Sequence, residues 1–241
     1  MSRPLEESAC RRVLLAWSSG KDSAWALHVC RQRRNLEVVA LFTTVDEVSG
    51  RVGMHHVRRE LVERQATAAR LPLWPVPLPW PASNEVYEAR LDETWRRAVA
   101  LGLTGVVFGD LFLDDIRAYR ERQLEGTGLE PFFPLWGRNT RELARDMQAS
   151  GLEAILTAVD LRYLEGDLVG RPFDSDLLRD LPSGVDPCGE NGEFHTFVWD
   201  GPIFEHTIPC SVGEIREHAG LAQADLLLAA GDVHGRRRRR Q

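Results

Sequence analysis

Residues 12–23 have the sequence RVLLAWSSGKDS, an apolar run that ends in a short polar loop. The apolar part, Arg12–Trp17, predicts a buried strand, and the amphipathic segment that follows, residues 23–34, predicts a helix. In a parallel sheet, the junction between a strand and the next helix lies at the carboxyl edge, where open α/β folds bind ligands. Small residues allow a sharp turn there, so that backbone N–H groups and the helix N-terminus face an anion.

The side chains of this loop favour a polyphosphate as that anion. Ser18 and Ser23 supply hydroxyl donors, and Lys21, the single lysine beside 29 arginines, supplies a mobile positive charge. The loop is not the P-loop pattern G-x-x-x-x-G-K-S/T, because the first glycine and its spacing are absent. The alternative is an ordinary strand–helix turn with a serine cap. The position after the first strand and the lone lysine favour phosphate binding.

Composition limits the class of protein. The 241 residues are 43% hydrophobic and 27% charged, which excludes disordered and collagen-like chains. No apolar run approaches the ~20 residues that span a bilayer, and the first residues lack a signal-peptide core, so we expect a cytoplasmic protein without membrane contact. Four widely spaced cysteines disfavour a zinc site or a redox pair.

The charge distribution disfavours nucleic acid as a partner. The formal charge is −6, and Arg236–Arg240 form a basic tail, so the rest of the chain carries −11. Broad nucleic-acid binding depends on neutralising phosphates, which an acidic body opposes.

Alternating segments predict an α/β protein with a Rossmann-like doubly wound parallel sheet, because strands separated by single helices pair in parallel. Beyond Arg12–Trp17, we expect strands over residues 37–45, 105–109 and 152–159, and an edge-like, proline-interrupted strand over 73–78. Expected helices cover residues 23–34, 55–71, 83–101, 114–124 and 140–149. The strict alternation weakens after Glu130. We therefore expect a nucleotide-binding domain over 1–130, a smaller C-terminal α/β domain over 131–210, and an extension with the arginine-rich tail over 211–241.

The most unusual stretch is Asp186–Phe204, DPCGENGEFHTFVWDGPIF. Gly189 and Gly192 frame a tight turn that carries Glu190 and Glu193, with Thr196 on the strand that follows. These carboxylates could hold a cation, an ammonium or an amino-acid head group. A β-hairpin with solvated glutamates explains the composition equally well.

Both stretches resemble known families. S-S-G-K-D-S resembles the S-G-G-x-D-S signature of the PP-loop ATP pyrophosphatases, also called adenine nucleotide alpha hydrolases, with Ser19 in place of a glycine. G-E-N-G-E-F-H-T-F-V, followed by D-G-P-I-F, resembles the G-E-x-G-E-x-x-T block of the diphthine–ammonia ligase family within that superfamily. The similarity runs in order from about Val13 to Phe204 and includes V-G-M-H-H at 52–56, V-F-G-D-L at 107–111, P-L-W-x-R-N-T-R-E-L at 134–143, A-V-D-L-R-Y-L at 158–164 and G-R at 170–171.

The resemblance implies an adenine nucleotide alpha hydrolase fold and an AMP-forming amide ligase that uses ATP and Mg²⁺. A carboxylate would be adenylated, pyrophosphate would leave, and ammonia would displace AMP; in the family the carboxylate belongs to diphthine on an elongation factor. The implied ATP-binding residues are Ser18, Ser19, Gly20, Lys21, Asp22 and Ser23, joined by Gly109 and Asp110. The implied acceptor- or ammonium-binding residues are Gly189, Glu190, Gly192, Glu193 and Thr196. The implied catalytic residues are Lys21, Asp22, Glu190 and Glu193.

Asp110 follows the expected strand over 105–109, which in a doubly wound sheet neighbours the first strand across the switch point. Gly109 would let the backbone approach the nucleotide, and Asp110 could hold Mg²⁺ or a ribose hydroxyl. The alternative is a turn in which Asp110 caps a helix. For the adjacent His55 and His56, one capping and one packed histidine are favoured over a shared metal ion.

Three functional alternatives remain beside the ligase. The bias to arginine suggests a GC-rich, bacterial genome, where the acceptor could be a small carboxylate, as in cofactor or corrinoid salvage. A nucleotide-binding module without catalysis is the second. The third, tRNA thiolation, is disfavoured by the acidic body and the lack of paired cysteines. A homodimer is an open expectation.

Overall fold

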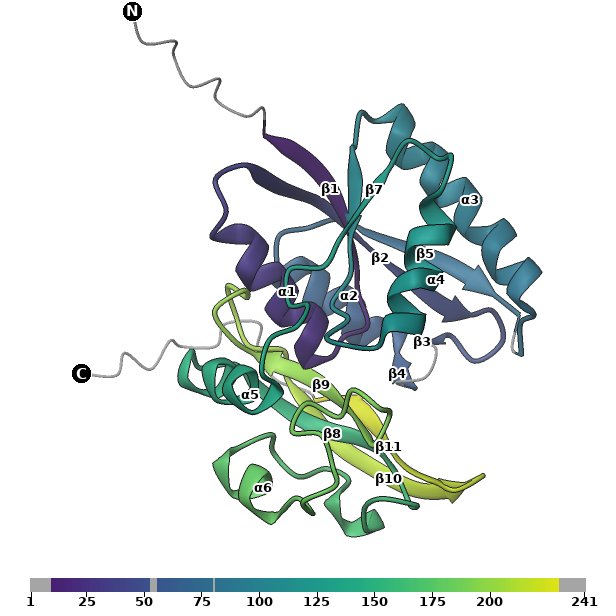
Figure 1. Ribbon diagram of the computed structural model, residues 1–241. Coiled ribbons are helices and arrows are strands. Elements are labelled where there is room, and N and C mark those ends of the chain that lie inside the picture. Colours follow the sequence, from purple (N-terminus) through teal and green to yellow (C-terminus); the bar gives the residue numbers. More distant parts are fainter. Residues whose placement is uncertain (1–9, 53–55, 80, 230–241) are drawn as a thin grey trace, which may run out of the picture.

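The computed structural model describes residues 10–52, 56–79 and 81–229 in two sheets with helices (Figure 1). The first sheet has a parallel core of five strands: β1 (Arg11–Ala16), β2 (Leu36–Asp46), β5 (Leu73–Leu78), β6 (Gly105–Val107) and β7 (Glu130–Phe132). Their spatial order is β5-β2-β1-β6-β7, with β1 in the centre. This order confirms the predicted Rossmann-like sheet, and β5 lies at its edge as expected.

Apolar side chains on β1 point alternately to the two faces of this sheet, which explains why helices cover both faces. Val13 and Leu15 pack into one core with α1 (Lys21–Arg31) and α2 (Arg59–Ala68), whereas Leu14 packs into a second core with α3 (Asn84–Ala100) and α4 (Asp114–Leu124). Successive side chains of a strand point to opposite faces, so a continuous apolar run is typical of a strand buried on both sides.

Helix boundaries follow local capping signals. The hydroxyl of Ser83 accepts a hydrogen bond from Val86 N, so α3 begins where the sequence predicts. The helix expected over 55–71 is shorter, because the two-residue strands β3 (Arg51–Val52) and β4 (Val57–Arg58) precede α2. β3 pairs with β2 beyond the end of β1.

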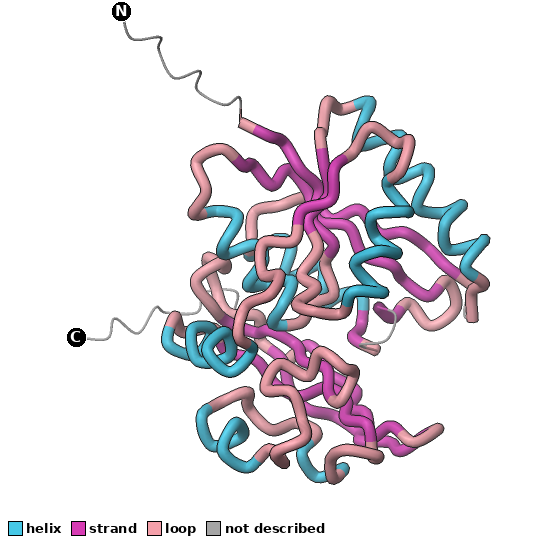
Figure 2. Tube along the Cα trace, viewed as in Figure 1, coloured by secondary structure: helices cyan, strands magenta, loops and turns pink. Residues whose placement is uncertain are grey.

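The second sheet is antiparallel in the order β10-β11-β8-β9. Its strands are β8 (Glu153–Asp160), β9 (Phe194–Asp200), β10 (Cys210–His218) and β11 (Leu221–Leu228). α5 (Thr140–Ala149), α6 (Ser175–Asp180) and the short 3-10 helix η1 (Gly166–Leu168) complete this half. Figure 2 shows this sheet beneath the carboxyl edge of the first.

Two expectations about the second half need correction. β7, which the sequence did not predict, belongs to the first sheet, and the boundary expected at Glu130 falls within this short strand. The predicted strand over 152–159 forms as β8 but belongs to the antiparallel sheet. Of the extension expected over 211–241, residues 211–228 belong instead to the β10–β11 hairpin, which pairs into that sheet through β8. The tail Arg236–Arg240 lies outside the described residues.

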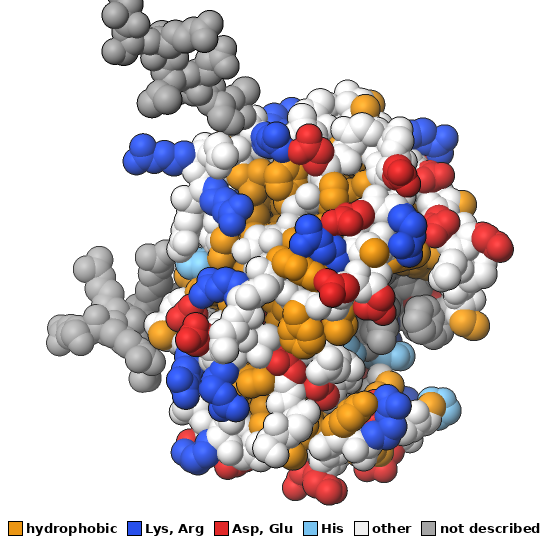
Figure 3. Space-filling model, viewed as in Figure 1, with side chains coloured by type: hydrophobic (Ala, Val, Ile, Leu, Met, Phe, Trp, Pro, Cys, Tyr) orange, Lys and Arg blue, Asp and Glu red, His pale blue; other side chains and the backbone are white. Residues whose placement is uncertain are grey.

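The two halves share one hydrophobic core. Buried side chains of α1 and α2 belong to the same hydrophobic cluster as those of α5, β8 and β9. The cluster includes Leu27, Val62, Leu143, Leu156 and Phe197. Acidic and basic side chains are interspersed on the visible face of the molecule (Figure 3). No helix among the described residues is both long and apolar enough to cross a membrane. The four cysteines have free thiols, and burial raises the pKa of Cys30 to about 11.

Candidate active site

A cavity of about 560 Å³ lies at the carboxyl ends of β1, β2 and β6. Its volume falls within the ~300–1,000 Å³ typical of small-molecule sites. Both halves of the chain line it, since Gly189, Glu190 and Gly192 on the turn before β9 border it together with the loop after β1. The lining includes the side chains of Ser18, Lys21, Asp22, Ser23, Phe42, Leu78, Phe108, Asp110, Arg120, Glu190, His195 and Thr196.

The loop after β1 has the geometry of an anion-binding turn. Gly20 is the N-cap of α1, and the hydroxyls of Ser18 and Ser23 lie 3.1 Å apart beside the cavity. Ser19 adopts φ 72°, the left-handed conformation that favours glycine, and this explains why the resembled signature has glycine at this position. The Ser19 side chain is fully buried and does not line the cavity. Of this residue, therefore, only the backbone shapes the loop.

Lys21 is fixed rather than mobile, which corrects the expectation from the sequence. The side chain is 1% exposed, and its ammonium donates to Asp22 Oδ2 at 2.9 Å and to the carbonyl oxygen of Cys188. The ammonium also lies 5.6 and 5.2 Å from the ring centres of Phe173 and Phe194. Burial alone would lower the pKa of Lys21, but the neighbouring Asp22 carboxylate opposes this, and the net direction is upward. The charged amine thus joins α1 to the second half of the chain.

Three carboxylates from three different segments face the cavity: Asp22 on α1, Asp110 after β6, and Glu190 on the turn before β9. Glu190 Oε1 accepts a hydrogen bond from Leu111 N at 2.6 Å. Burial raises the pKa of Glu190 to about 7; the Leu111 N–H opposes this rise, and the charges of Asp22 and Asp110 add to it. Burial likewise raises the pKa of Asp110. Glu190 therefore titrates near neutral pH.

Gly109 borders the cavity and also lies against the start of α1. A Cβ at this position would lie 3.1 Å from Asp22 C and from Ser23 N. Glycine therefore lets the segment after β6 approach the start of α1 closely.

The carboxylates fit a magnesium ion shared with phosphates. Asp22 Oδ1 and Asp110 Oδ2 are buried oxygens that accept no hydrogen bond among the described residues. Magnesium is commonly held by one or two carboxylates together with substrate phosphates and waters. Within the same residues, no group of three or more His, Cys, Asp or Glu side chains is arranged around a metal position. The protein alone thus offers a partial site, which bound phosphates would complete.

Glu193 does not face the cavity, contrary to the expected substrate-binding and catalytic role. Its carboxylate is 1% exposed and accepts hydrogen bonds from Asp186 N (3.0 Å), Asn191 N (3.0 Å) and Asn191 Nδ2 (2.9 Å). Glu193 therefore holds the shape of the turn. Gly189 and Gly192 have φ values of 68° and 86°, which confirms the tight turn that they frame.

Thr196 faces the start of α1. Its hydroxyl accepts the N–H of Lys21 at 3.1 Å, so a strand of the second half caps the helix of the first. The loop is held from the same side by Val198 N, which donates to Ser19 O at 3.0 Å. Gln65 Nε2 donates to Ser19 O as well, at 3.0 Å.

Two cavity residues were not singled out from the sequence. His195 lies between Phe194 and Thr196, and burial, together with the nearby Lys21 and His56, lowers the pKa of His195 to about 4. Its position inside the G-E-N-G-E-F-H-T block was the only available signal. Arg120 on α4 is one of 29 arginines, and no pattern distinguished it. His56 has φ 51° and lies near the cavity, whereas His55 lies outside the described residues.

Comparison with known proteins assigns both halves to one family. The family model described as the diphthamide synthase N-terminal domain matches residues 11–131, and the model of the diphthamide synthase C-terminal domain matches residues 139–225. The chain belongs to the diphthamide synthase family. This membership confirms the resemblance found in the sequence, and the second match includes β10 and most of β11.

Named relatives of the diphthamide synthase family are moderately similar. The diphthine–ammonia ligase of Bos taurus is 33% identical over 125 residues, covering 50% of this chain and 47% of the relative. The diphthine–ammonia ligase of Schizosaccharomyces pombe is 28% identical over 228 residues, covering 86% of this chain and 37% of the relative. The chain thus spans about half the length, or less, of these curated relatives. The U34-tRNA thiolase NcsA of Methanococcus maripaludis is 15% identical and covers 58% of this chain and 57% of that chain with a TM-score of 0.37, a similarity too low to bear on function.

Proposed function

We propose that this protein is an ATP-dependent, AMP-forming amide ligase that adenylates a carboxylate and amidates it with ammonia. The observation that carries the proposal is a single cavity lined by the loop after β1, from the first half of the chain, and by Glu190, from the second half. The family membership and the names of the relatives support the same chemistry.

ATP would be held at the carboxyl edge of the parallel sheet. The first N–H groups of a helix have no partner within the helix. In α1 that of Lys21 donates to Thr196, so the N–H groups of Asp22 and Ser23, with the hydroxyls of Ser18 and Ser23, would bind phosphate oxygens. The apolar side chains of Phe42, Leu78 and Phe108 line the rest of this region and suit a purine base. Magnesium, held by Asp22 and Asp110, would neutralise charge on the phosphates.

The two steps of the reaction need different groups. In the first, an acceptor carboxylate oxygen attacks the α-phosphorus and pyrophosphate leaves with the broken α–β bond. In the second, ammonia attacks the acyl carbon, and AMP leaves with the electrons of the carbon–oxygen bond. A carboxylate that titrates near neutral pH can accept a proton from ammonium, and Glu190 has this property. We therefore assign ammonium binding and deprotonation to Glu190.

The proposed acceptor is the carboxylate of diphthine on an elongation factor. The relatives named diphthine–ammonia ligase support this choice. The acceptor would enter from the side of the second half, where Gly192 and His195 line the cavity. A small carboxylate is the alternative that the experiment separates.

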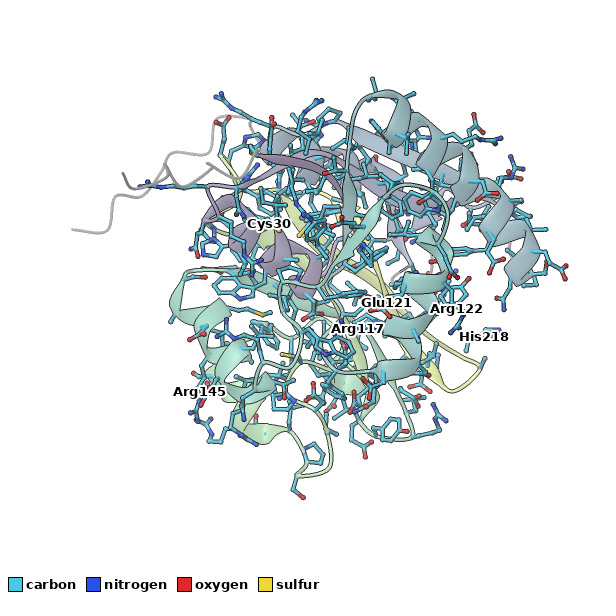
Figure 4. All side chains as sticks on the ribbon, turned by 45° about the horizontal axis from the view of Figure 1, so that its top comes forward. Cys30, Arg117, Glu121, Arg122, Arg145 and His218 are labelled. Carbon is cyan, nitrogen blue, oxygen red and sulfur yellow. The ribbon has the colours of Figure 1, made fainter. Side chains whose placement is uncertain are left out.

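Pyrophosphate release tests the proposal. Wild type is incubated with ATP, Mg²⁺ and ammonium, with and without diphthine-bearing elongation factor, and compared with Asp22→Asn and Glu190→Gln. The matched control is Glu121→Gln, since Glu121 lies on the outside of α4, 46% exposed (Figure 4). We expect acceptor-dependent release that both cavity variants lose and the control keeps. ATP binding without release would indicate a nucleotide-binding module, and release only with small carboxylates would change the acceptor.

A further inference from the structure

The cavity contains more negative than positive side chains. Among the described residues that line it, Asp22, Asp110 and Glu190 are acidic, and only Lys21 and Arg120 are permanent cations. The reaction proposed above brings two anions together here, a polyphosphate and a carboxylate. Their repulsion requires fixed positive charge at the point where they meet.

Lys21 is poorly placed to supply that charge alone. Its ammonium already binds Asp22 Oδ2 and the carbonyl oxygen of Cys188, and it lies against the rings of Phe173 and Phe194. An ammonium has three donors, so these partners leave little capacity for a ligand. Turning it toward the cavity would break the contact between α1 and Cys188.

Arg120 has unused donors in the same cavity. Its guanidinium lies 5.1 Å above the ring of Phe108. Its Nε is 3.7 Å from Asp110 Oδ2 and donates no hydrogen bond within the part of the chain that the structure describes. The remaining contacts are long: Nη1 lies 3.4 Å from Tyr87 Oη and 3.4 Å from Gln123 Oε1. The side chain is 25% exposed. A planar cation with five donors is thus positioned by a ring and a carboxylate without being saturated.

We propose that Arg120 binds an anionic oxygen of a substrate in this cavity, either a phosphate of ATP or the carboxylate of the acceptor. The guanidinium fork matches both groups, because each presents two oxygens in one plane. Phe108 and Asp110 orient the fork from the end of β6. This inference rests on the proposed ligase function and adds a residue that neither the loop nor the turn before β9 contains.

The first arm of the test measures equilibrium binding of ATP, inorganic tripolyphosphate and adenosine to wild type, Arg120→Met and Arg120→Lys. The matched control is Arg117→Met, because Arg117 lies on the same helix, pairs with Glu121 and stacks on Phe133 and Trp136 outside the cavity (Figure 4). If a phosphate is the ligand, Arg120→Met weakens ATP and tripolyphosphate binding about 10- to 100-fold and leaves adenosine unchanged. Arg120→Lys restores part of the loss.

The second arm measures the KM for the acceptor at saturating ATP. If the acceptor carboxylate is the ligand, Arg120→Met raises this KM by a similar factor while ATP binding stays at the wild-type level. Melting temperatures report whether each variant is folded, and Arg120→Lys serves in both arms if the methionine variant unfolds. The inference is overturned if both Arg120 variants match Arg117→Met in both arms. Wild type that binds ATP yet releases no pyrophosphate would contradict the ligase function and not phosphate binding by Arg120.

Discussion

The backbone N–H of Lys21 donates to the hydroxyl of Thr196 at 3.1 Å, across 175 positions of sequence. Lys21 is the first residue of α1 and Thr196 lies in β9, so the hydrogen bond joins the first helix to the second sheet at the edge of the cavity. The helix N-terminus to which phosphate binding is assigned in the proposed function is therefore positioned by a strand of the other half. Several expected effects of substitution depend on this arrangement.

Replacing Thr196 by valine keeps the shape of the side chain and removes the acceptor. The N–H of Lys21 is then buried without a partner, which costs about 1–3 kcal/mol. We expect a matching decrease in the free energy of unfolding in urea and weaker ATP binding, and Thr196→Ser should retain most of both. Equal stability of the valine and serine variants would contradict the capping role.

Replacing Ser19 by glycine should preserve or raise the stability of the protein. The left-handed φ of 72° costs a non-glycine residue about 1–2 kcal/mol, and the buried Ser19 hydroxyl has no hydrogen-bond partner among residues 10–52, 56–79 and 81–229. The greater freedom of glycine in the unfolded chain offsets about 1 kcal/mol of that gain. We expect a melting temperature equal to or higher than wild type with ATP binding retained, whereas Ser19→Val should lower both.

Asp225 should set the acid stability of the contact between the halves. Its carboxylate accepts hydrogen bonds from Arg58 Nε (2.9 Å), Arg58 Nη2 (2.7 Å) and Arg51 Nη2 (2.9 Å). These bonds, first those from Arg58, lower the pKa of Asp225 to about 2. Because the folded-state pKa is depressed, the stabilisation is present above pH ~4 and is lost as the pH falls toward 2.

The measurement for this ion pair is urea unfolding as a function of pH. Asp225→Asn should reduce stability near pH 7 by about 1–2 kcal/mol, after allowance for its 26% exposure, and should flatten the profile between pH 4 and 2. Asp146→Asn is the control, since the pair of Arg138 and Asp146 is about half exposed. Identical acid profiles for the two variants would show that Asp225 has no special role.

Glu190 should impose the opposite pH dependence. Its pKa is raised from the ordinary 4.5 to about 7, so the folded state binds a proton that the unfolded state releases. The contribution to stability is complete below pH ~4.5 and is lost as the pH rises through 7, up to about 3 kcal/mol. Glu190→Gln, which resembles the protonated acid, should abolish this loss. The carboxylate form is the active one in the proposed mechanism, so kcat should rise over the same interval. A pH-independent kcat between 6 and 8 would argue against proton transfer by Glu190.

Local signals predicted much of the fold. The apolar run before Ser18, the serine that begins the helix over 83–101 and the proline-interrupted edge strand each act over a few residues, and the structure contains all three. β7 was not predicted because three residues that include Pro131 carry no periodic pattern. The antiparallel pairing of β8 depends on partners more than 30 residues away, and no local feature of the strand distinguishes the two sheets.

Roles within the cavity were harder to predict than its location. The carboxylates of Glu190 and Glu193 are three residues apart on one turn, yet one faces the cavity and the other binds backbone N–H groups. Both residues are glutamates, and only the path of the backbone through the turn determines which carboxylate faces the cavity. Lys21 was expected to reach a ligand, but aromatic rings and a carbonyl oxygen from the second half surround it. These partners lie more than 150 positions away in the sequence.

The carbonyl oxygen of Ser19 accepts hydrogen bonds from Val198 N and Gln65 Nε2, while Gln65 Oε1 accepts from Trp17 Nε1. The loop after β1, to which nucleotide binding is assigned in the proposed function, is therefore held by groups from both domains of the family. The loop within residues 11–131 depends on hydrogen bonds from the C-terminal half for its conformation. Exchange of the C-terminal half between relatives would therefore change the contacts that hold the loop after β1. We expect such chimaeras to lose ATP binding unless residues 17–21 and 194–198 are exchanged together.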